Sequence, residues 1–271
     1  MNFTQCKTMA IINQKGGVGK TTTCINLAVS LVNMGKNVLV VDLDSQANLT
    51  MGMGYANPDE LPIKLADLLQ AEITKRTTGQ KADVYRKEDF ILSAHGVDFI
   101  PSSLDLAGLE ITLMNTIGRE TVLKSFLEQF KDDYQYILID CLPSLGIFTV
   151  NALTASDEII IPVQAQFFGA KGVEALMQSV GSVQTYLNPK LKVLGILITM
   201  LDGRSKFQKE VGEIVQQSFA EYTKIFKTAV PLSVEVSRGQ SQGTPIVALK
   251  NNRVSEAYNE FAKEVLEYEQ Q

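Results

Sequence analysis

The sequence predicts a doubly wound α/β fold, in which a mostly parallel sheet is covered by helices on both faces. Short apolar runs alternate with longer segments of helical periodicity. Near-continuous apolar strands separated by helices are typical of parallel sheets, because both faces of such a sheet are buried. With 271 residues and 45% apolar content, the chain is long enough to bury one sizeable core, and we interpret residues 1–271 as a single domain without internal repeats.

Seven strands are expected, each an apolar run bounded by polar or turn-forming residues. They are expected at 7–12, 37–44, 97–102, 134–140, 158–164, 192–199 and 224–231. Helices are expected between and after them, near 20–34, 61–71, 104–130, 145–155, 170–187, 205–222 and 252–268. The stretch 71–89 is polar and dense in charge, and we expect an exposed loop or hairpin insert there.

The composition argues against several classes of protein. No run approaches eighteen uninterrupted apolar residues, so no transmembrane helix is expected. The start, "MNFTQCKT", lacks the charged and apolar blocks of a signal peptide, which favours a cytoplasmic location. The three cysteines, Cys6, Cys24 and Cys141, show no C-x-x-C spacing and are expected to be small buried residues. The single histidine, His95, has no second histidine with which to share a metal.

The net charge of −5 argues against a protein that coats nucleic acid over its whole surface. The charge is unevenly spread, however. Residues 192–253 carry nine basic and five acidic side chains, or +4, which leaves 16 basic and 25 acidic elsewhere, or −9. The C-terminal third therefore has room for a modest basic face, although such an imbalance is often only solvated surface.

A phosphate-binding loop is predicted by "NQKGGVGKTTT", residues 13–23. It follows an expected strand and opens an expected helix, which is the context that such a loop requires. Its glycines, Gly16, Gly17 and Gly19, let successive backbone N–H groups face one concavity that binds an anion. The helix that starts near Lys20 adds the partial positive charge of its N-terminus.

Three side chains at the end of this loop have the chemistry that a nucleoside triphosphate with Mg²⁺ requires. Lys20 can reach the β- and γ-phosphates, and the hydroxyl of Thr21 can bind Mg²⁺. Thr22 can hydrogen-bond the α-phosphate. The alternative, a glycine-rich turn with a chance Gly-Lys-Thr, is disfavoured because strand, spacing and helix all agree. The loop therefore predicts binding of ATP and Mg²⁺.

The loop differs from the common pattern G-x-x-x-x-G-K-[ST], whose first glycine would fall at Gln14. A second lysine, Lys15, stands beside it, and this variant resembles the "deviant" Walker A motif of the MinD/ParA group of ATPases. The resemblance implies that Lys15 reaches across an ATP-dependent homodimer to the phosphates held by the partner. A cation delivered in this way neutralises the charge that develops on the transferring phosphoryl group. The alternative is a surface lysine that assists phosphate binding in its own subunit.

Carboxylates at the ends of two expected strands complete the motif. Asp42 and Asp44, in "VLVVDLDSQANLT", lie two residues apart on a strand, so both are expected to face the phosphate loop. By the resemblance, Asp44 orients the attacking water and Asp42 supports the Mg²⁺ shell. The family often has proline and glycine where Ser45 and Ala47 stand.

A third carboxylate, Asp140, ends the apolar strand of "YQYILIDCLPSLG". An aspartate in this position holds Mg²⁺ through water, as in a Walker B motif. The family typically has two prolines after it, and here Leu142 stands at the first of them, so we expect a local adjustment of the backbone. Carboxylates at strand ends are often structural, but here they accompany a phosphate loop.

The resemblance extends over nearly the whole chain and is strongest to chromosome and plasmid partition ATPases of the ParA/Soj type. "NALTASDEIIIPVQ", "LGILITMLDGR" and "RVSEAYNEFAKEV" are also similar to these proteins. By the same resemblance, Pro231 and Ser233 lie where the adenine ring is held, although the family has asparagine in place of Ser233. The expected ATP-binding residues are Lys15, Gly16, Gly17, Val18, Gly19, Lys20, Thr21, Thr22, Pro231 and Ser233.

The group contains three classes that differ in features readable from the sequence. A MinD-like ATPase that is recruited to membranes should end in a basic amphipathic helix, whereas this chain ends "FAKEVLEYEQQ", with three glutamates and one lysine. A reductase-type relative with an iron–sulfur cluster shared between subunits needs cysteines placed as ligands, and Cys141 has no second candidate nearby. A DNA-partition ATPase remains, and neither a membrane partner nor a cluster is expected.

For DNA partition, the ATP-bound dimer should offer basic residues to DNA phosphates without reading bases. The candidates lie in the basic C-terminal third and are Arg204, Lys206, Lys209, Lys227, Arg238 and Arg253. One departure bears on this surface. Leu232 and Glu235 stand where the family commonly has arginines, so the DNA contacts are expected at Arg238 or at another surface.

The sequence therefore predicts a weak ATPase for plasmid or chromosome partition. In this prediction ATP and Mg²⁺ close a homodimer that binds nonspecific double-stranded DNA. The protein is then cytoplasmic and is associated with the nucleoid when ATP is bound. A centromere-binding partner of the ParB type, with a basic disordered peptide, stimulates hydrolysis. The alternative is a nucleotide-gated regulatory or scaffold dimer, a MinD-like positioning protein that does not bind DNA. The substitutions at Leu232 and Glu235 keep this alternative open.

Overall fold

The computed structural model describes residues 6–79, 85–164, 169–202, 223–249 and 252–268. Within these ranges, eight strands form one sheet in the order β3-β4-β2-β5-β1-β6-β7-β8, and every neighbouring pair is parallel except β3 and β4. The strands are β1 (Lys7–Ile11), β2 (Val38–Leu43), β3 (Leu92–Ala94), β4 (Val97–Ile100), β5 (Tyr136–Cys141), β6 (Glu158–Gln164), β7 (Lys192–Leu201) and β8 (Ile225–Pro231). The predicted doubly wound, mostly parallel sheet is confirmed.

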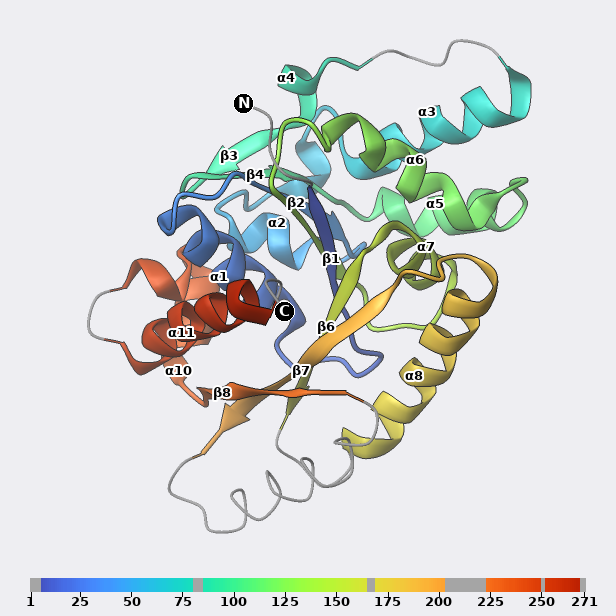
Figure 1. Cartoon of the computed structure of the whole chain (residues 1–271). Coiled ribbons are helices and arrows are strands. Elements are labelled where there is room, and N and C mark those ends of the chain that lie inside the picture. The colour runs from blue at the N-terminus through green and yellow to red at the C-terminus, as the bar shows by residue number, and fades with distance from the viewer. Residues whose placement is uncertain (1–5, 80–84, 165–168, 203–222, 250–251, 269–271) are drawn as a thin grey trace.

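Helices cover both faces of this sheet, as Figure 1 shows. The α-helices are α1 (Lys20–Asn33), α2 (Asn48–Gly52), α3 (Leu65–Thr78), α4 (Lys87–Phe90), α5 (Asp105–Met114), α6 (Val122–Leu127), α7 (Ile147–Ala155), α8 (Gly169–Tyr186), α10 (Val234–Ser241) and α11 (Arg253–Tyr268). Short 3₁₀ turns are η1 (Pro58–Glu60), η2 (Arg119–Thr121), η3 (Glu128–Phe130) and η4 (Ile246–Ala248). Helices α1 and α11 lie on one side of the sheet, and α3 and α5 to α8 lie on the other.

The hydrophobic core has two layers because alternate residues of each strand point to opposite faces. In β1, Met9 and Ile11 join the layer under α1 and α11, whereas Ala10 joins the layer under α3 and α5 to α8. The edge strand β8 is bonded to helix α11 by Glu264. The carboxylate of Glu264 accepts the N–H groups of Lys227 and Thr228 at 2.6 and 3.0 Å. The interpretation of 1–271 as one domain stays a prediction.

The sheet has one strand that the apolar pattern did not predict. β3 is only three residues long and pairs antiparallel with β4 through the two-residue turn His95–Gly96. Both turn residues have positive φ, 54° and 79°, which is the conformation of the tight turns that suit twisted hairpins. A strand this short carries too little hydrophobic pattern to be distinguished from the turn itself.

Two expectations for the helices were wrong. The single helix expected over 104–130 is divided into α5 and α6, and Gly118 lies between them with φ of 65°. The loop expected over 71–89 is helical at its start, since α3 continues to Thr78, and at its end, where α4 forms. Residues 80–84 lie outside the described residues.

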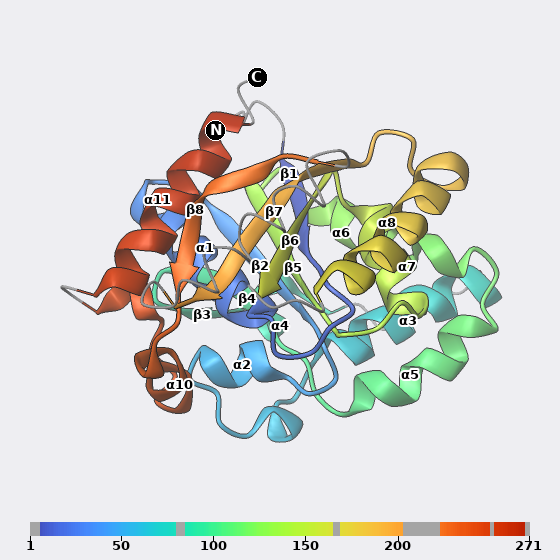
Figure 2. The same ribbon diagram turned by 90° about the horizontal axis from the view of Figure 1, so that it is seen from below.

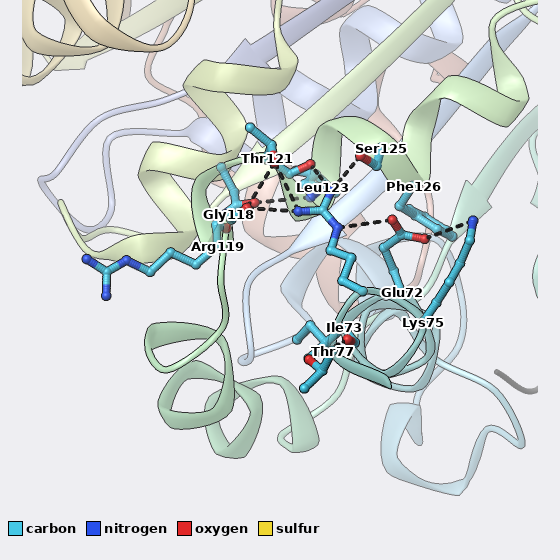
Figure 3. Close-up of polar contacts among 12 residues, drawn as sticks. Glu72, Ile73, Lys75, Thr77, Gly118, Arg119, Thr121, Leu123, Ser125 and Phe126 are labelled. Carbon is cyan, nitrogen blue, oxygen red and sulfur yellow. Dashed lines mark hydrogen bonds and ion pairs between the residues drawn. The ribbon is translucent and has the colours of Figure 1, made fainter. Parts of the chain in front are cut away.

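Arg76 gives the physical reason for the longer α3. Its guanidinium donates to Gly118 O and Thr121 O, both at 2.8 Å, and to the hydroxyl of Thr121 at 3.0 Å. It also pairs with Glu72 one turn earlier, at 3.2 Å. Figure 3 shows Glu72, Gly118 and Thr121 joined by this network, which couples the last turns of α3 to the segment before α6. The charge-rich end of α3 is therefore packed by these long-range contacts together with the buried Ile73.

Two further helices were not predicted, and both border the site described below. Helix α2 follows β2, and α10 follows β8; the two lie side by side in Figure 2. α10 begins at Val234, and the hydroxyl oxygen of the preceding Ser233 caps the helix by accepting the N–H of Glu235 at 3.2 Å. The helix expected over 205–222 lies outside the described residues.

Candidate nucleotide site

The segment between β1 and α1 has the backbone of an anion-binding loop. Gly17 and Gly19 have φ of 73° and 88°, a region that only glycine enters without strain. Gly19 is the N-cap of α1, which begins at Lys20. The free N–H groups of the first turn of α1 therefore meet the loop, as the sequence predicts.

Two residues that sequence reasoning missed hold this loop in place. The side chain of Asn13 donates to Pro162 O of β6 at 2.8 Å and accepts the N–H of Lys15 at 3.0 Å. The hydroxyl of Thr199 in β7 donates to Val18 O at 2.8 Å, in a buried position. The only sign of these two residues in the sequence is that each is a polar residue near the end of an apolar strand. The contacts themselves join residues 149 and 181 positions apart.

Lys20 is buried, with 7% of its surface exposed, and its ammonium donates to Lys15 O at 3.1 Å. Burial lowers the pKa of Lys20, while the nearby Asp140 acts in the opposite direction. The ammonium is therefore held inside the loop, close to carboxylates and without full hydration. Such a group favours a bound anion strongly, because an added negative charge offsets the cost of its burial.

Asp42 and Asp140 face each other as register partners on β2 and β5, and both are fully buried. One oxygen of Asp42 accepts the N–H and the hydroxyl of Thr50 in α2, at 2.9 and 2.7 Å. Burial nevertheless raises the pKa of Asp42 to about 7. The predicted magnesium residue therefore also anchors α2, a contact that the sequence did not reveal.

Asp140 has the least satisfied carboxylate of the site. Neither oxygen has a hydrogen-bond partner of good geometry among the described residues. Burial raises the pKa of Asp140 well above its usual value, and the charge of Asp42 adds to this effect; the neighbouring Thr21 hydroxyl and the Lys20 ammonium oppose it. A buried carboxylate without a donor is costly, so this position is suited to a bound cation.

A cavity of about 730 Å³ joins these elements. Its volume is in the range of small-molecule sites in proteins. The loop, the first turn of α1 and the residue directly after β2 contribute Gly16, Gly17, Gly19, Lys20, Thr21, Thr22 and Asp44 to its lining. The opposite end is formed by β7, β8, α2 and α10, through Met51, Met200, Pro231, Leu232, Ser233, Val236, Ser237, Gln240 and Ser241.

Most of the predicted site residues line this cavity, but four do not. Val18 is buried in the core, and only its carbonyl contributes, as the acceptor of Thr199. Asp42 and Asp140 lie beneath the lining rather than in it. The side chain of Lys15 is half-buried beside the cavity and is not part of its lining. Asp44 lines the cavity, whereas Asp42 is buried and bonded to Thr50, and the expectation that both face the phosphate loop stays a prediction.

Asp44 lies at the end of β2 and lines the cavity. Its carboxylate accepts the N–H of Gln46 at 3.0 Å, which holds the turn that leads into α2. In this turn Ala47 has a φ of 51°, in the left-handed region. That conformation explains why a glycine is favoured there and shows that the alanine is accommodated with some strain.

The other departures from the family pattern also have structural explanations. Leu142 packs against the core, and its carbonyl accepts the N–H of Ser144 at 2.9 Å in the turn after β5. Glu235 hydrogen-bonds Asn252, whose side chain also caps α11 by accepting the N–H of Val254 at 2.8 Å. Leu232 is 59% exposed at the mouth of the cavity.

The described residues can hold Mg²⁺ only together with the phosphates of a bound nucleotide. No group of three or more His, Cys, Asp or Glu residues that could bind a metal by itself is found in the described ranges. Mg²⁺, however, usually keeps several waters and binds one or two carboxylates together with substrate phosphates. The buried carboxylate of Asp140, with the hydroxyl of Thr21 beside it, fits that requirement.

The predicted DNA residues are only partly within the described ranges. Arg238 on α10, Arg253 at the start of α11 and Lys227 on β8 are exposed. Arg204, Lys206 and Lys209 lie outside the described residues. Across the described ranges, no helix is long and apolar enough to span a membrane. The three cysteines are free and buried, as expected.

Comparisons with known proteins agree with this geometry. The model of a family described as "AAA domain" matches residues 6–193. The sporulation initiation inhibitor protein Soj of Bacillus subtilis is 42% identical over 266 residues, with 96% of this chain and 98% of that protein covered. The chromosome partitioning protein ParA of Caulobacter vibrioides is 36% identical over 272 residues, covering 99% and 97%.

A solved structure has the same fold. It is cobyrinic acid a,c-diamide synthase from Mycobacterium smegmatis with bound ADP and magnesium, which superposes with a TM-score of 0.81 at 30% identity. The match covers 98% of this chain and 96% of that chain.

Proposed function

Since the chain belongs to the ParA/Soj-type family of ATPases, we propose that it is an ATP-driven switch for partitioning DNA. ATP with Mg²⁺ closes a homodimer, the dimer binds nonspecific double-stranded DNA in the nucleoid, and a ParB-type centromere-binding partner stimulates hydrolysis and resets it. The observation that carries this proposal is a cavity lined by the phosphate loop, Lys20 and Asp44, with the buried Asp140 beneath its lining.

The phosphates bind at the loop end of the cavity. Backbone N–H groups of the loop and of the first turn of α1 face them, and Lys20 pairs with the β- and γ-phosphates. The hydroxyl of Thr22 donates to the α-phosphate. Thr21 and Asp140 would hold Mg²⁺, and Asp42 would support that site. When bound, Mg²⁺ neutralises the charge of the β- and γ-phosphate oxygens.

Hydrolysis requires an oriented water, and Asp44 is the cavity-lining carboxylate that can hold one. Its backbone is fixed by the turn into α2, so the carboxylate is held at the edge of the cavity. Lys15 completes the site of the partner subunit by placing a second cation against the phosphates. Pro231 and Ser233 hold the adenine ring at the other end.

The DNA surface of the closed dimer is formed by exposed basic side chains, including Arg238 and Arg253. Contacts with phosphates alone give binding without sequence preference and with a steep dependence on salt. The experiment that tests this is binding to a nonspecific duplex with ATP, ADP or no nucleotide, at two salt concentrations. Asp44→Ala is included to trap the ATP-bound state.

Binding that requires ATP and weakens steeply with salt is the expected result. The alternative function is a nucleotide-gated scaffold that positions a partner without touching DNA. It is favoured by two observations: Leu232 is apolar and exposed, and Glu235 is engaged by Asn252, where relatives commonly have arginines. Dimerisation with ATP but no DNA binding in any state would establish the scaffold instead.

A further inference from the structure

Helix α10 forms the wall of the cavity opposite the phosphate loop, and one of its side chains reaches across. Val236, Ser237, Gln240 and Ser241 share the face of α10 that lines the cavity. The side-chain amide of Gln240 donates to the hydroxyl oxygen of Thr22 in α1 at 2.9 Å. This bond joins residues 218 positions apart and connects the two ends of the cavity.

The direction of this bond has a chemical consequence for Thr22. A hydroxyl group has one proton to donate and two lone pairs that accept. An amide N–H that occupies a lone pair of Thr22 leaves its proton available for another acceptor. The usual acceptor for a threonine inside a helix is the carbonyl four residues earlier. Here that carbonyl is Val18 O, one of whose two lone pairs accepts the hydroxyl of Thr199 at 2.8 Å.

We propose that Gln240 is a positioning residue for nucleotide binding: it keeps the hydroxyl of Thr22 oriented as a donor toward the α-phosphate. The inference rests on the proposed function in one respect, the assignment of Thr22 to the α-phosphate. Gln240 does not touch the reacting atoms. It makes phosphate binding at Thr22 depend on the position of α10, the wall against which the base and ribose lie.

The position of α10 is itself held at both ends. At its start, Ser233 caps the helix and Glu235 is bonded to Asn252. After its end, Gly243 lies so close to the loop after α2 that a Cβ atom there would be 2.5 Å from the Cα of Gly54. The carbonyl of Gly243 also accepts the ring Nε2–H of His95 at 2.9 Å. A helix anchored in this way can present one amide at a defined place.

The test compares ADP affinity by calorimetry in three variants. Gln240→Met keeps the length of the side chain without the donor, and Gln240→Glu replaces the donor with an acceptor. Gln242→Glu is the matched control: it adds the same charge two residues away, at an exposed position that does not line the cavity. The bond from the Thr22 hydroxyl to the α-phosphate forms only when nucleotide binds, and a neutral hydrogen bond is worth a factor of about five in an equilibrium. Gln240→Met, which leaves that hydroxyl unoriented, should therefore bind ADP up to about fivefold more weakly.

Gln240→Glu should bind more weakly than Gln240→Met, because the carboxylate draws the Thr22 proton away from the phosphate and adds repulsion. Gln242→Glu should bind within about twofold of the original protein, since an exposed single charge is well screened. The midpoint of thermal unfolding without nucleotide should change little in all three variants. A purely structural role for Gln240 would instead lower that midpoint.

A double-mutant cycle with Thr22→Val separates the inference from its premise. If Gln240 acts through Thr22, Gln240→Met has no further effect on ADP affinity in the Thr22→Val background. An equal loss in both backgrounds would overturn the positioning role while leaving the assignment of Thr22 intact. Unchanged ADP affinity in Thr22→Val alone would instead overturn that assignment, and the inference with it.

Discussion

At the scale of the residue, the site is built from groups whose burial is unfavourable without a ligand. Asp42 and Asp140 are fully buried register partners, and both have a raised pKa. Lys20 is buried with a lowered pKa. Functional sites commonly contain buried ionisable groups with shifted pKa values. A ligand of opposite charge binds well there because it offsets the free-energy cost of burying those groups. The nucleotide-free protein therefore carries a cost that a bound cation and phosphates relieve.

Asp140→Asn should stabilise the nucleotide-free protein at neutral pH. Burial and the charge of Asp42 raise the pKa of Asp140, so folding at neutral pH costs free energy relative to the unfolded chain, in which this group ionises freely. The neutral amide removes that cost, and we expect a gain of about 1–3 kcal/mol in the free energy of unfolding. The variant should also lose Mg²⁺-dependent ATP binding. Urea unfolding in EDTA and ATP titration with Mg²⁺ measure the two effects. A destabilised variant would show that Asp140 has a structural role.

The pH dependence of stability follows from the same carboxylates. The folded-state pKa of Asp42 is about 7, above that of an unfolded chain, so the folded protein holds this proton more tightly. Stability from this group is complete below about pH 4 and declines as the pH rises to about 7. Nucleotide-free protein should therefore show a larger contribution from Asp42 near pH 5 than near pH 7.5, measured as the difference in unfolding free energy from Asp42→Asn. An equal difference at both values would contradict the raised pKa.

At the scale of the element, the phosphate loop owes its position to strands far away in the sequence. β6 holds its start through Asn13, and β7 holds its middle through Thr199. α10 has a similar dependence, since its anchors come from α11, the loop after α2 and the β3–β4 turn. Short irregular elements of this kind have few contacts of their own, so individual long-range bonds decide where they lie.

Thr199→Val should loosen the phosphate loop. The valine keeps the shape but leaves Val18 O buried without its donor, which costs about 1–3 kcal/mol. We expect lower stability and weaker ADP binding, measured by urea unfolding and calorimetry. Thr199→Ser is the matched control, because it keeps the hydroxyl, and its ADP affinity should stay near that of the original protein. Equal losses in both variants would assign the effect to the methyl group.

Gly243→Ala should displace α10. The alanine has an unfavourable backbone at φ of 61°, and its Cβ would overlap the backbone of Gly54. Gly35→Ala is the control for the first effect alone, because Gly35 has φ of 80° and open space around it. We expect Gly35→Ala to cost about 1 kcal/mol and Gly243→Ala about 1–3 kcal/mol more, with weaker nucleotide binding in the latter only. Equal costs would show that the contact of Gly243 with Gly54 is unimportant.

At the scale of the whole molecule, the proposed function requires a second copy of the chain. The cavity is lined by the phosphate loop, the start of α1, Asp44 and residues of α2 and α10. Figure 2 shows α2 and α10 side by side. Lys15 lies beside that cavity without lining it, which is compatible with action on a neighbouring subunit. Coupling of nucleotide state to association would then need only one cation from each copy.

Lys15→Ala should retain nucleotide binding but lose ATP-dependent dimerisation and hydrolysis. The loop glycines and Lys20 still bind phosphates in the same subunit, whereas the cation for the partner is gone. Calorimetry, light scattering with ATP and phosphate release measure the three properties. Loss of nucleotide binding itself would identify Lys15 as a phosphate ligand within its own subunit, and ATP-dependent dimers would contradict the proposed role across the interface.

The sequence by itself determined the sheet, the phosphate loop and the positions of its aspartates, because these depend on local periodicity and on short motifs. The contacts between distant residues are known only from the tertiary structure. They are the bonds of Asp42 with Thr50, Thr199 with the phosphate loop, Arg76 with the segment before α6, and Gln240 with Thr22. The physical reason is that a single hydrogen bond between distant residues leaves no periodic trace in a sequence. Its partners are known only when the sheet brings the ends of its strands together.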